Sequence, residues 1–281
     1  MVLMHRILVI GATGNVGSQV LSHFATTSAQ VCAMVRDPEA ARFPAQVDVV
    51  RGDLTLPETL DACLDGIESV FLVWTVPPVT ACAVLERIAK SVQRIVFLSA
   101  PLKTAHPFFQ QPNPLRSIAE QMERMIETSR LEWTFLRPGM FAGNARHWWG
   151  LQIRAGDVVR WPYLSAPTAP IDERDIAAIA VRALCEDGHA GEGYVLTGPQ
   201  SLTQMEQVSI IGRVIGRSLQ IEEISPEEAR QELHIPAVLL DAWGAAIGQL
   251  AFVTSTVADI TGRPARTFLD WATDHVAEFR A

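Results

Sequence analysis

Residues 7–21 read ILVIGATGNVGSQVL, in which four apolar residues lead through three glycines into a helical apolar pattern. A short apolar run that ends at a glycine is typical of a buried strand. In a strand–turn–helix unit the first glycine permits a tight turn, the second lets the backbone approach a pyrophosphate, and the third lets helix and strand pack closely. The helix N-terminus then supplies N–H donors and partial positive charge. The spacing of Gly11, Gly14 and Gly17 therefore predicts a dinucleotide-binding turn.

Further runs rich in Val and Ile alternate with helical patterns through the first half of the chain. We expect strands at residues 31–35, 47–50, 70–74, 95–98 and 133–136, and helices around residues 39–42, 58–64, 80–91 and 115–128. Strands of this composition, joined by helices, are typical of a parallel sheet that is buried on both faces. We therefore predict an α/β fold with a doubly wound parallel-sheet Rossmann core.

Beyond about residue 140 the sequence is irregular and rich in Trp and Pro. From residue 201 it is mainly helical, with a last helix expected at residues 267–279. An amphipathic helix at residues 172–186, followed by a short strand in "EGYVLTG", is expected to return to the core. The predicted core is therefore residues 1–145 together with 172–198. A smaller, mainly helical C-terminal lobe, expected to cover the substrate, comprises residues 146–171 and 199–281.

The residues that follow the second expected strand distinguish between two nicotinamide dinucleotides. A carboxylate there binds the ribose hydroxyls of NAD, whereas an arginine suits the 2′-phosphate of NADP. In "AMVRDPEA" Arg36 comes first after the apolar run, which favours NADP(H) over NAD(H). Asp37 has an alternative local role, because Asp before Pro38 is a good N-cap for a following helix. Asp53 and Leu54, after the third strand, are expected where an adenine ring would lie.

Composition narrows the class of protein. The formal net charge of −8 argues against a nucleic-acid partner, because a phosphate backbone is held by a basic surface. No run of 18 apolar residues is present, and the first ten residues lead into the glycine turn instead of a cleavage site. We expect a cytoplasmic protein with a small-molecule substrate and no membrane partner, either a monomer or a homodimer. The four cysteines show neither a CxxC pair nor a metal-like spacing, so no metal is expected.

Several segments resemble the NmrA-like, atypical branch of the short-chain dehydrogenase/reductase superfamily. They are "GATGNVG", "AMVRDPEA", "RGDLTLPETL", "RIVFLSA", "LEWTFLRPGMF", "YVLTGPQSLT" and "TGRPARTFLDW". The resemblance implies a core that binds NADP(H) and a C-terminal lobe over the substrate. It implies phosphate contacts from Gly11, Thr13, Gly14, Asn15, Val16 and Arg36, with Gly17 in the same turn, adenine contacts from Asp53 and Leu54, and nicotinamide contacts from Pro138, Gly139 and Phe141.

The usual chemistry of that superfamily requires a Tyr and a Lys four residues apart on one helical face. The tyrosines of this chain are Tyr163 and Tyr194, and neither is followed four residues later by Lys. The corresponding positions hold Leu115 and Ala119, so the standard Tyr–Lys proton relay is excluded. Ser99, after the fifth expected strand, stands where the superfamily often has a serine and is one catalytic candidate.

Two functions remain open. In the first, NADPH passes hydride directly to a small quinone-like, flavin or unsaturated acceptor, whose anion needs no dedicated tyrosine for its protonation. His147 would then be a second catalytic candidate, with His106 as another proton donor. The residues expected to line a flat substrate pocket are Met140, Phe141, His147, Trp148 and Trp161, although large aromatic residues also pack protein cores. In the second function, the protein is a non-catalytic sensor of NADP(H) redox state that signals to a partner.

Overall fold

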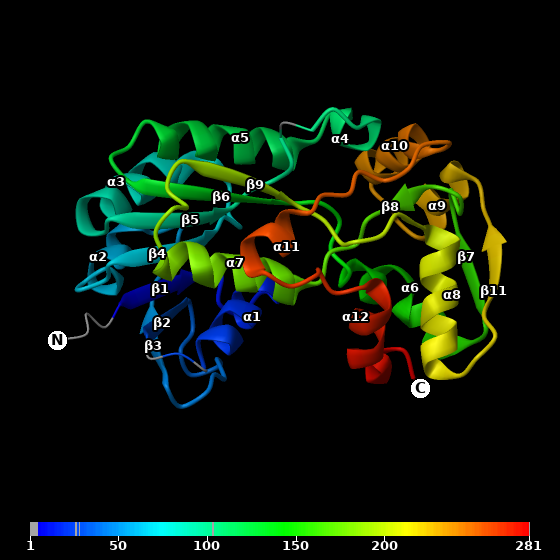
Figure 1. Ribbon diagram of the computed structural model, residues 1–281, viewed down its shortest axis with the longest axis horizontal. Helices are drawn as coiled ribbons and strands as arrows, with labels where there is room; N and C mark the ends of the chain where they lie inside the picture. Colours follow the sequence, from blue (N-terminus) through cyan, green and yellow to red (C-terminus); the bar gives the residue numbers. More distant parts are fainter. Residues whose placement is uncertain (1–4, 26, 28, 103, 281) are drawn as a thin grey trace. The chain divides into compact units, whose positions relative to one another are not determined.

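The computed structural model describes residues 5–25, 27, 29–102 and 104–280 of the 281-residue chain (Figure 1). The chain forms two compact units, and each is assembled from three stretches of sequence. Unit 1 comprises Met1–Ala100, Pro114–Arg137 and Glu173–Tyr194, and unit 2 comprises Pro101–Asn113, Pro138–Asp172 and Val195–Ala281. Residues 101–113, 138–145, 172 and 195–198, which we expected in the core, therefore fall in unit 2.

A seven-stranded sheet with the order β3-β2-β1-β4-β5-β6-β9 organises the first unit. The pairings from β3 through β6 are parallel, and the strand order reverses direction on either side of β1, as in a doubly wound fold. The predicted α/β fold is confirmed. The strands are β1 (Arg6–Ile10), β2 (Gln30–Val35), β3 (Val47–Arg51), β4 (Ser69–Val73), β5 (Arg94–Leu98), β6 (Glu132–Pro138) and β9 (Glu192–Leu196).

The central strands are continuous apolar runs because both of their faces are covered. Leu8, Val70 and Ile95 are each 0% exposed, and they belong to one hydrophobic cluster with residues of the flanking helices. A strand buried on one face only would alternate between apolar and polar residues. The uninterrupted pattern of the sequence therefore follows from the position of these strands in the middle of a layered structure.

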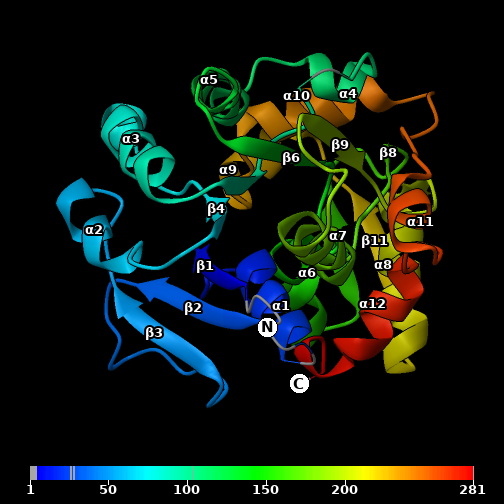
Figure 2. The same ribbon diagram turned by 60° about the vertical axis from the view of Figure 1, so that its left-hand side comes forward.

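Helices cover both faces of this sheet. On one side α1 (Asn15–Phe24) packs against α7 (Glu173–Cys185), and on the other α3 (Ala81–Ser91) packs against α5 (Pro114–Glu127) and α2 (Leu60–Cys63), as Figure 2 shows. Two short 3₁₀ helices, η1 (Pro57–Thr59) and η2 (Pro78–Thr80), precede α2 and α3. The helices predicted at residues 115–128 and 172–186 are thus present within a residue of their expected ends.

Two predicted helices are wrong in whole or in part. Residues 39–42 do not form a helix, because residues 38–40 make a turn in which the Glu39 N–H donates to Oδ1 of Asp37 at 3.1 Å. The final helix, expected at residues 267–279, is interrupted at His275 into α12 (Phe268–Asp274) and the 3₁₀ helix η3 (Val276–Glu278).

Unit 2 is mainly helical and is built around buried aromatic residues. Trp149, Trp161, Trp243 and Trp271 are at most 2% exposed and belong to one hydrophobic cluster. Two small sheets pair β8 with β10 and β7 with β11. Its elements are α4 (Pro107–Gln110), α6 (Asn144–Ala155), β7 (Val158–Trp161), β8 (Pro167–Thr168), β10 (Leu202–Thr203), α8 (Gln204–Ile215), β11 (Gln220–Glu223), α9 (Pro226–Glu232), α10 (Ala237–Ala246), α11 (Thr256–Thr261), α12 and η3.

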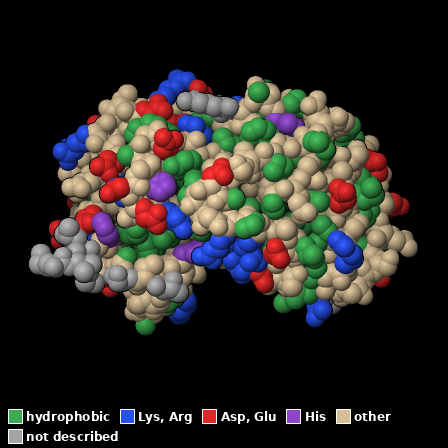
Figure 3. Space-filling view, viewed as in Figure 1, with side chains coloured by type: hydrophobic (Ala, Val, Ile, Leu, Met, Phe, Trp, Pro, Cys, Tyr) green, Lys and Arg blue, Asp and Glu red, His purple; other side chains and the backbone are tan. Residues whose placement is uncertain are grey.

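Within the part of the chain that the structure describes, no helix is both long enough and apolar enough to cross a bilayer. On the face shown in Figure 3, hydrophobic side chains occur in small separate groups among polar and charged ones.

Candidate functional site

The glycine turn at the end of β1 has the geometry that its sequence predicts. Gly11 has a φ of +88°, a region that favours glycine, and its carbonyl accepts a hydrogen bond from the Gly14 N–H at 3.0 Å. A Cβ on Gly17 would lie 2.1 Å from the Gly11 carbonyl oxygen, so any side chain there would displace the turn. Helix α1 starts at Asn15, and no described side chain caps it. Its first N–H groups therefore form a cradle of the kind that binds a phosphate.

A groove of about 520 Å³ extends from this turn along the carboxyl ends of the strands of unit 1. In open α/β sheets a dinucleotide binds at this edge, where the strand order reverses. Of the residues that we expected at the cofactor, those that line the groove are Gly11, Thr13, Gly14, Arg36, Asp53 and Leu54. Asn15, Val16 and Gly17 follow in α1 without lining it, and Pro138 is buried at the end of β6.

Arg36 and Asp37 differ in their availability to a ligand. The Arg36 side chain is exposed at the end of β2 and makes no hydrogen bond or ion pair with any residue that the structure describes. Asp37 instead accepts a hydrogen bond from the Glu39 N–H, as an Asx turn does. Asp37 therefore has a local structural role, as the sequence allowed. It stabilises a turn, however, and does not cap a helix. The groove is therefore lined by a guanidinium that has no hydrogen-bonded partner among the described residues.

Asp53 is held on the same groove as an ionised carboxylate. The Thr55 N–H and hydroxyl each lie 2.8 Å from Oδ1 of Asp53, and these two bonds lower the pKa of the carboxyl group. The positive charge of Arg36 lowers the same pKa further, while slight burial opposes it. The groove is thus lined by a charged acceptor, Asp53, as well as by the apolar side chain of the next residue, Leu54.

Ser99, one of the two catalytic candidates, belongs to a buried polar network of unit 1. Its hydroxyl donates to Oε1 of Glu123 at 2.6 Å. Glu123 also accepts two hydrogen bonds from Arg137, from Nε at 2.8 Å and from Nη2 at 2.7 Å, in the bidentate geometry of a strong ion pair. Glu123 and Arg137 are 3% and 6% exposed. Because its hydrogen is donated to Glu123, the Ser99 oxygen is left as an acceptor.

The helix that would carry a Tyr–Lys pair has neither residue at the two corresponding positions. Leu115 is 73% exposed on α5 and Ala119, one turn later, is 7% exposed. One further turn along the same helix lies Glu123, which is buried in its ion pair. These positions of α5 therefore contain no group that could relay a proton to a substrate.

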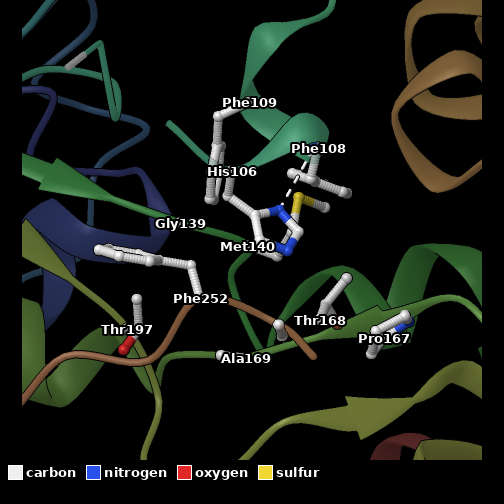
Figure 4. A pocket seen from close by; sticks show the side chains of 11 residues that line it. His106, Phe108, Phe109, Gly139, Met140, Pro167, Thr168, Ala169, Thr197 and Phe252 are labelled. Carbon is white, nitrogen blue, oxygen red and sulfur yellow. Dashed lines mark hydrogen bonds between the residues drawn. The ribbon is translucent and has the colours of Figure 1, made fainter. Parts of the chain in front are cut away.

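A narrow apolar pocket lies within unit 2 (Figure 4). Its Gly139 and Met140 follow β6 directly in the chain, since that strand ends at Pro138. Four further segments contribute the rest: α4 with the residues around it, the β8 region, Thr197 directly after β9, and the stretch after α10. The lining residues are His106, Phe108, Phe109, Gly139, Met140, Pro167, Thr168, Ala169, Thr197, Ala251 and Phe252.

This pocket contains few of the residues that we expected around a substrate. Met140 lines it, but Phe141 does not, and pairs through an isolated bridge with Ile171. His147 is exposed on α6 and lies outside the lining. Trp148 and Trp161 pack against each other and against Trp149 and Trp243, with ring centroids between 5.2 and 6.0 Å apart.

Trp148 and Trp161 do not line this pocket, and their ring contacts are those of core packing, the alternative that the sequence left open. His106, rather than His147, is the histidine of the pocket. The sequence signal was present in "HPFF", where a histidine precedes Pro107 and two phenylalanines. Among the described residues no group of three or more His, Cys, Asp or Glu could hold a metal ion.

Comparison with known proteins identifies the family. The family described as NAD(P)H-binding matches residues 11–187, which include the glycine turn and most of the sheet. The chain belongs to this NAD(P)H-binding family. Its glycine cradle and its groove are the features that such a cofactor needs.

Two curated relatives match almost the full length. A (4-alkanoyl-5-oxo-2,5-dihydrofuran-3-yl)methyl phosphate reductase of Streptomyces griseus is 36% identical over 97% of this chain and 99% of its own. An NAD(P)H azoreductase of Xenophilus azovorans is 34% identical over 98% of this chain and 99% of its own.

The fold also matches solved structures. The triphenylmethane reductase of a Citrobacter species, solved as a complex with NADP(H), superposes with a TM-score of 0.81 at 21% identity. The superposition covers 96% of this chain and 99% of that one. The two proteins therefore share their fold from end to end.

Proposed function

We propose that this NAD(P)H-binding protein is an NADPH-dependent reductase of the NmrA-like type that acts on a small conjugated acceptor. The observation that carries the proposal is the full-length similarity to two reductases, together with a glycine cradle and an unpaired Arg36 on one groove. One relative is named as the reductase of a substituted dihydrofuranone phosphate and the other as an azoreductase, and both kinds of compound contain conjugated double bonds.

The preference for NADPH over NADH rests on the residues after β2. Arg36 is exposed and uncommitted, and an arginine forms bidentate hydrogen bonds to a phosphate. Asp37 is the residue that would bind the ribose of NADH, and its carboxylate is engaged by the Glu39 N–H. The N-terminus of α1 would hold the pyrophosphate, Asp53 and Leu54 would flank the adenine, and Pro138 and Gly139 would lie by the nicotinamide.

The reaction proposed here needs no protein acid. Bound NADPH supplies the hydride. The acceptor gains a bond to hydrogen, the resulting anion is stabilised by conjugation, and water provides the proton. This route agrees with the side chains of α5, where Leu115 and Ala119 replace a proton relay, and with Ser99, whose hydrogen is donated to Glu123. Ser99 and His147 are accordingly not assigned as proton donors.

Kinetic and binding measurements test this proposal directly. The Kd values of NADPH and NADH are measured first, and the loss of NADPH absorbance is then followed with a quinone, a flavin and an azo dye. Tight NADPH binding with oxidation of at least one acceptor is the expected result. Tight binding with no oxidation of any acceptor would overturn the reductase proposal and favour a redox sensor.

A further inference from the structure

Every polar side-chain atom in the pocket of unit 2 already has a partner in the protein, and His106 is the clearest case. Its Nε2 lies 2.8 Å from the Leu250 carbonyl oxygen, which only accepts, so Nε2 carries a hydrogen. Its Nδ1 lies 3.2 Å from the Phe108 backbone nitrogen, which only donates, so Nδ1 carries none. The two contacts define a neutral tautomer. His106 therefore joins α4 to the segment after α10 and offers a ligand neither a charge nor a free N–H.

The two threonines of the pocket are also committed. Thr197 Oγ1 accepts from the Thr254 N–H at 2.9 Å and faces the Thr254 hydroxyl, whose own hydrogen is donated to the Val195 carbonyl. Figure 4 shows the Thr197 oxygen directed away from the Phe252 ring. Thr168 Oγ1 accepts from Nε2 of Gln207 at 2.9 Å, in a buried contact. Both hydroxyl oxygens thus accept a hydrogen bond from the surrounding protein, while the Thr168 hydroxyl hydrogen is donated to no residue that the structure describes.

The remaining lining is apolar. Phe108 and Phe109 meet edge to face with centroids 4.9 Å apart, and Met140 and Phe252 complete the wall. Of the described residues that line the pocket, none is Lys, Arg, Asp or Glu. The free space between these side chains is about 10 Å³, the size of one water molecule. An entering ring must therefore displace side chains, for which flexible Met140 and the partly exposed Phe252 are suited.

We infer that this pocket selects an uncharged aromatic acceptor and rejects anionic ones. The inference rests on the proposed reductase function and names the acceptor class of that function. A phosphate or sulfonate placed here would lose water and gain no cation among the described lining residues, with only a neutral threonine hydroxyl as a side-chain donor, which is unfavourable. An uncharged ring would gain contact with phenylalanine faces and a thioether. The chain thus differs in substrate class from its Streptomyces griseus relative, which is named for a phosphate ester.

A matched pair of azo dyes tests the inference by binding. The probes are 4-(dimethylamino)azobenzene and its 4′-sulfonate, which differ only in the anionic group. Isothermal titration is carried out with saturating NADP⁺, under which neither dye is reduced. We expect the neutral dye to bind at least about 10-fold more tightly than the sulfonate, a factor typical of one unpaired polar group.

Two variants connect the selectivity to the pocket. Phe252→Ala should weaken binding of the neutral dye at least about 5-fold through lost ring contact. Leu269→Ala removes a side chain of similar size and exposure from α12, outside the pocket, and should leave binding unchanged. Met140→Arg adds a cation to the wall and should raise the affinity for the sulfonate above that of the unsubstituted protein.

Three results would overturn the inference: equal or tighter binding of the sulfonate, binding of neither dye, or a neutral-dye Kd that Phe252→Ala leaves unchanged. Failure of the proposed function gives a different result. In that case the neutral dye binds selectively with NADP⁺ but is not bleached when NADPH replaces it. The two proposals are therefore separable in one set of titrations.

Discussion

The Ser99 hydroxyl donates a 2.6 Å hydrogen bond to the buried carboxylate of Glu123. That carboxylate is paired with Arg137, and a Cβ on Gly193 would lie 2.4 Å from Nη1 of the same guanidinium. Three parts of unit 1, the end of β5, the middle of α5 and the end of β6, are thereby joined by one charged group. Removing two charges from water is costly, so the arrangement is stable only while both partners are present.

Loss of the charge at Glu123 is expected to destabilise the protein strongly. Glu123→Gln would leave Arg137 buried without a counter-charge, at a cost of about 3 kcal/mol in the free energy of unfolding. Urea denaturation measures this value. Glu120→Gln, on the same helix, is the matched control, because the Glu120–Arg124 pair is exposed and contributes less than about 1 kcal/mol. A similar loss of unfolding free energy in the two variants would contradict the prediction that the buried ion pair contributes more to stability than the exposed one.

Removal of Arg36 is expected to change cofactor selectivity. Arg36→Ala should weaken NADPH binding at least about 10-fold, because a charge-assisted contact to the 2′-phosphate is lost, and should leave NADH binding nearly unchanged. Fluorescence titration with each cofactor gives the two Kd values. Arg51→Ala removes an equally positive, exposed side chain that does not line the groove, and serves as the control. An equal loss of affinity for NADH and NADPH would contradict the proposal that Arg36 binds the 2′-phosphate.

A side chain at Gly17 should disturb the cradle. Gly17→Ala would place a methyl group against the Gly11 carbonyl, so the turn must shift, with a loss of about 1–3 kcal/mol in stability and weaker NADPH binding. Gly156→Ala is the control, since a Cβ at this extended residue meets open space. Thermal unfolding and cofactor titration are the measurements. Unchanged NADPH affinity in Gly17→Ala would count against the cradle as the phosphate site.

Asp53 should contribute to the acid dependence of stability. Its pKa in the folded protein lies below the usual value of 3.8, because Thr55 donates two hydrogen bonds to the ionised form. A lowered folded pKa adds stability above the unfolded pKa, and this stability is lost as the pH falls through the folded value. Asp53→Asn should therefore be less stable than the unsubstituted protein at neutral pH, with a difference that shrinks below about pH 4. A difference in unfolding free energy between the two proteins that stays constant across the pH range would contradict a contribution from the lowered pKa of Asp53.

The sequence predicted the strands correctly where the apolar pattern of a segment reflects its burial. Residues 7–10 are at most 1% exposed, and this burial is what their uninterrupted apolar run indicated. The prediction of a helix at residues 39–42 was wrong. This short connection forms a turn instead, which is stabilised by the hydrogen bond from the Glu39 N–H to Asp37. The hydrophobicity pattern of a sequence does not indicate whether such a local hydrogen bond forms.

The pocket was harder to predict because its members are far apart in the chain. His106 is held in the pocket by a hydrogen bond to the carbonyl of Leu250, which lies 144 residues further along the chain. Trp148 and Trp161 meet Trp243 in the core, and nothing in an aromatic segment distinguishes a core ring from a binding ring until these contacts are known. The groove, by contrast, is built from residues that directly follow β1, β2 and β3, so strand prediction located Gly11, Arg36 and Asp53 together.

The packing of α1 against α7 has a consequence for biosynthesis. Helix α1 ends at Phe24, whereas α7 begins only at Glu173. While the ribosome is adding the residues between them, the apolar side of α1, with Val20, Leu21 and Phe24, has not yet met this partner. The nascent chain therefore leaves the α7-facing side of α1 uncovered by α7 until Cys185 has left the exit tunnel, and uncovered apolar surface of this kind favours aggregation.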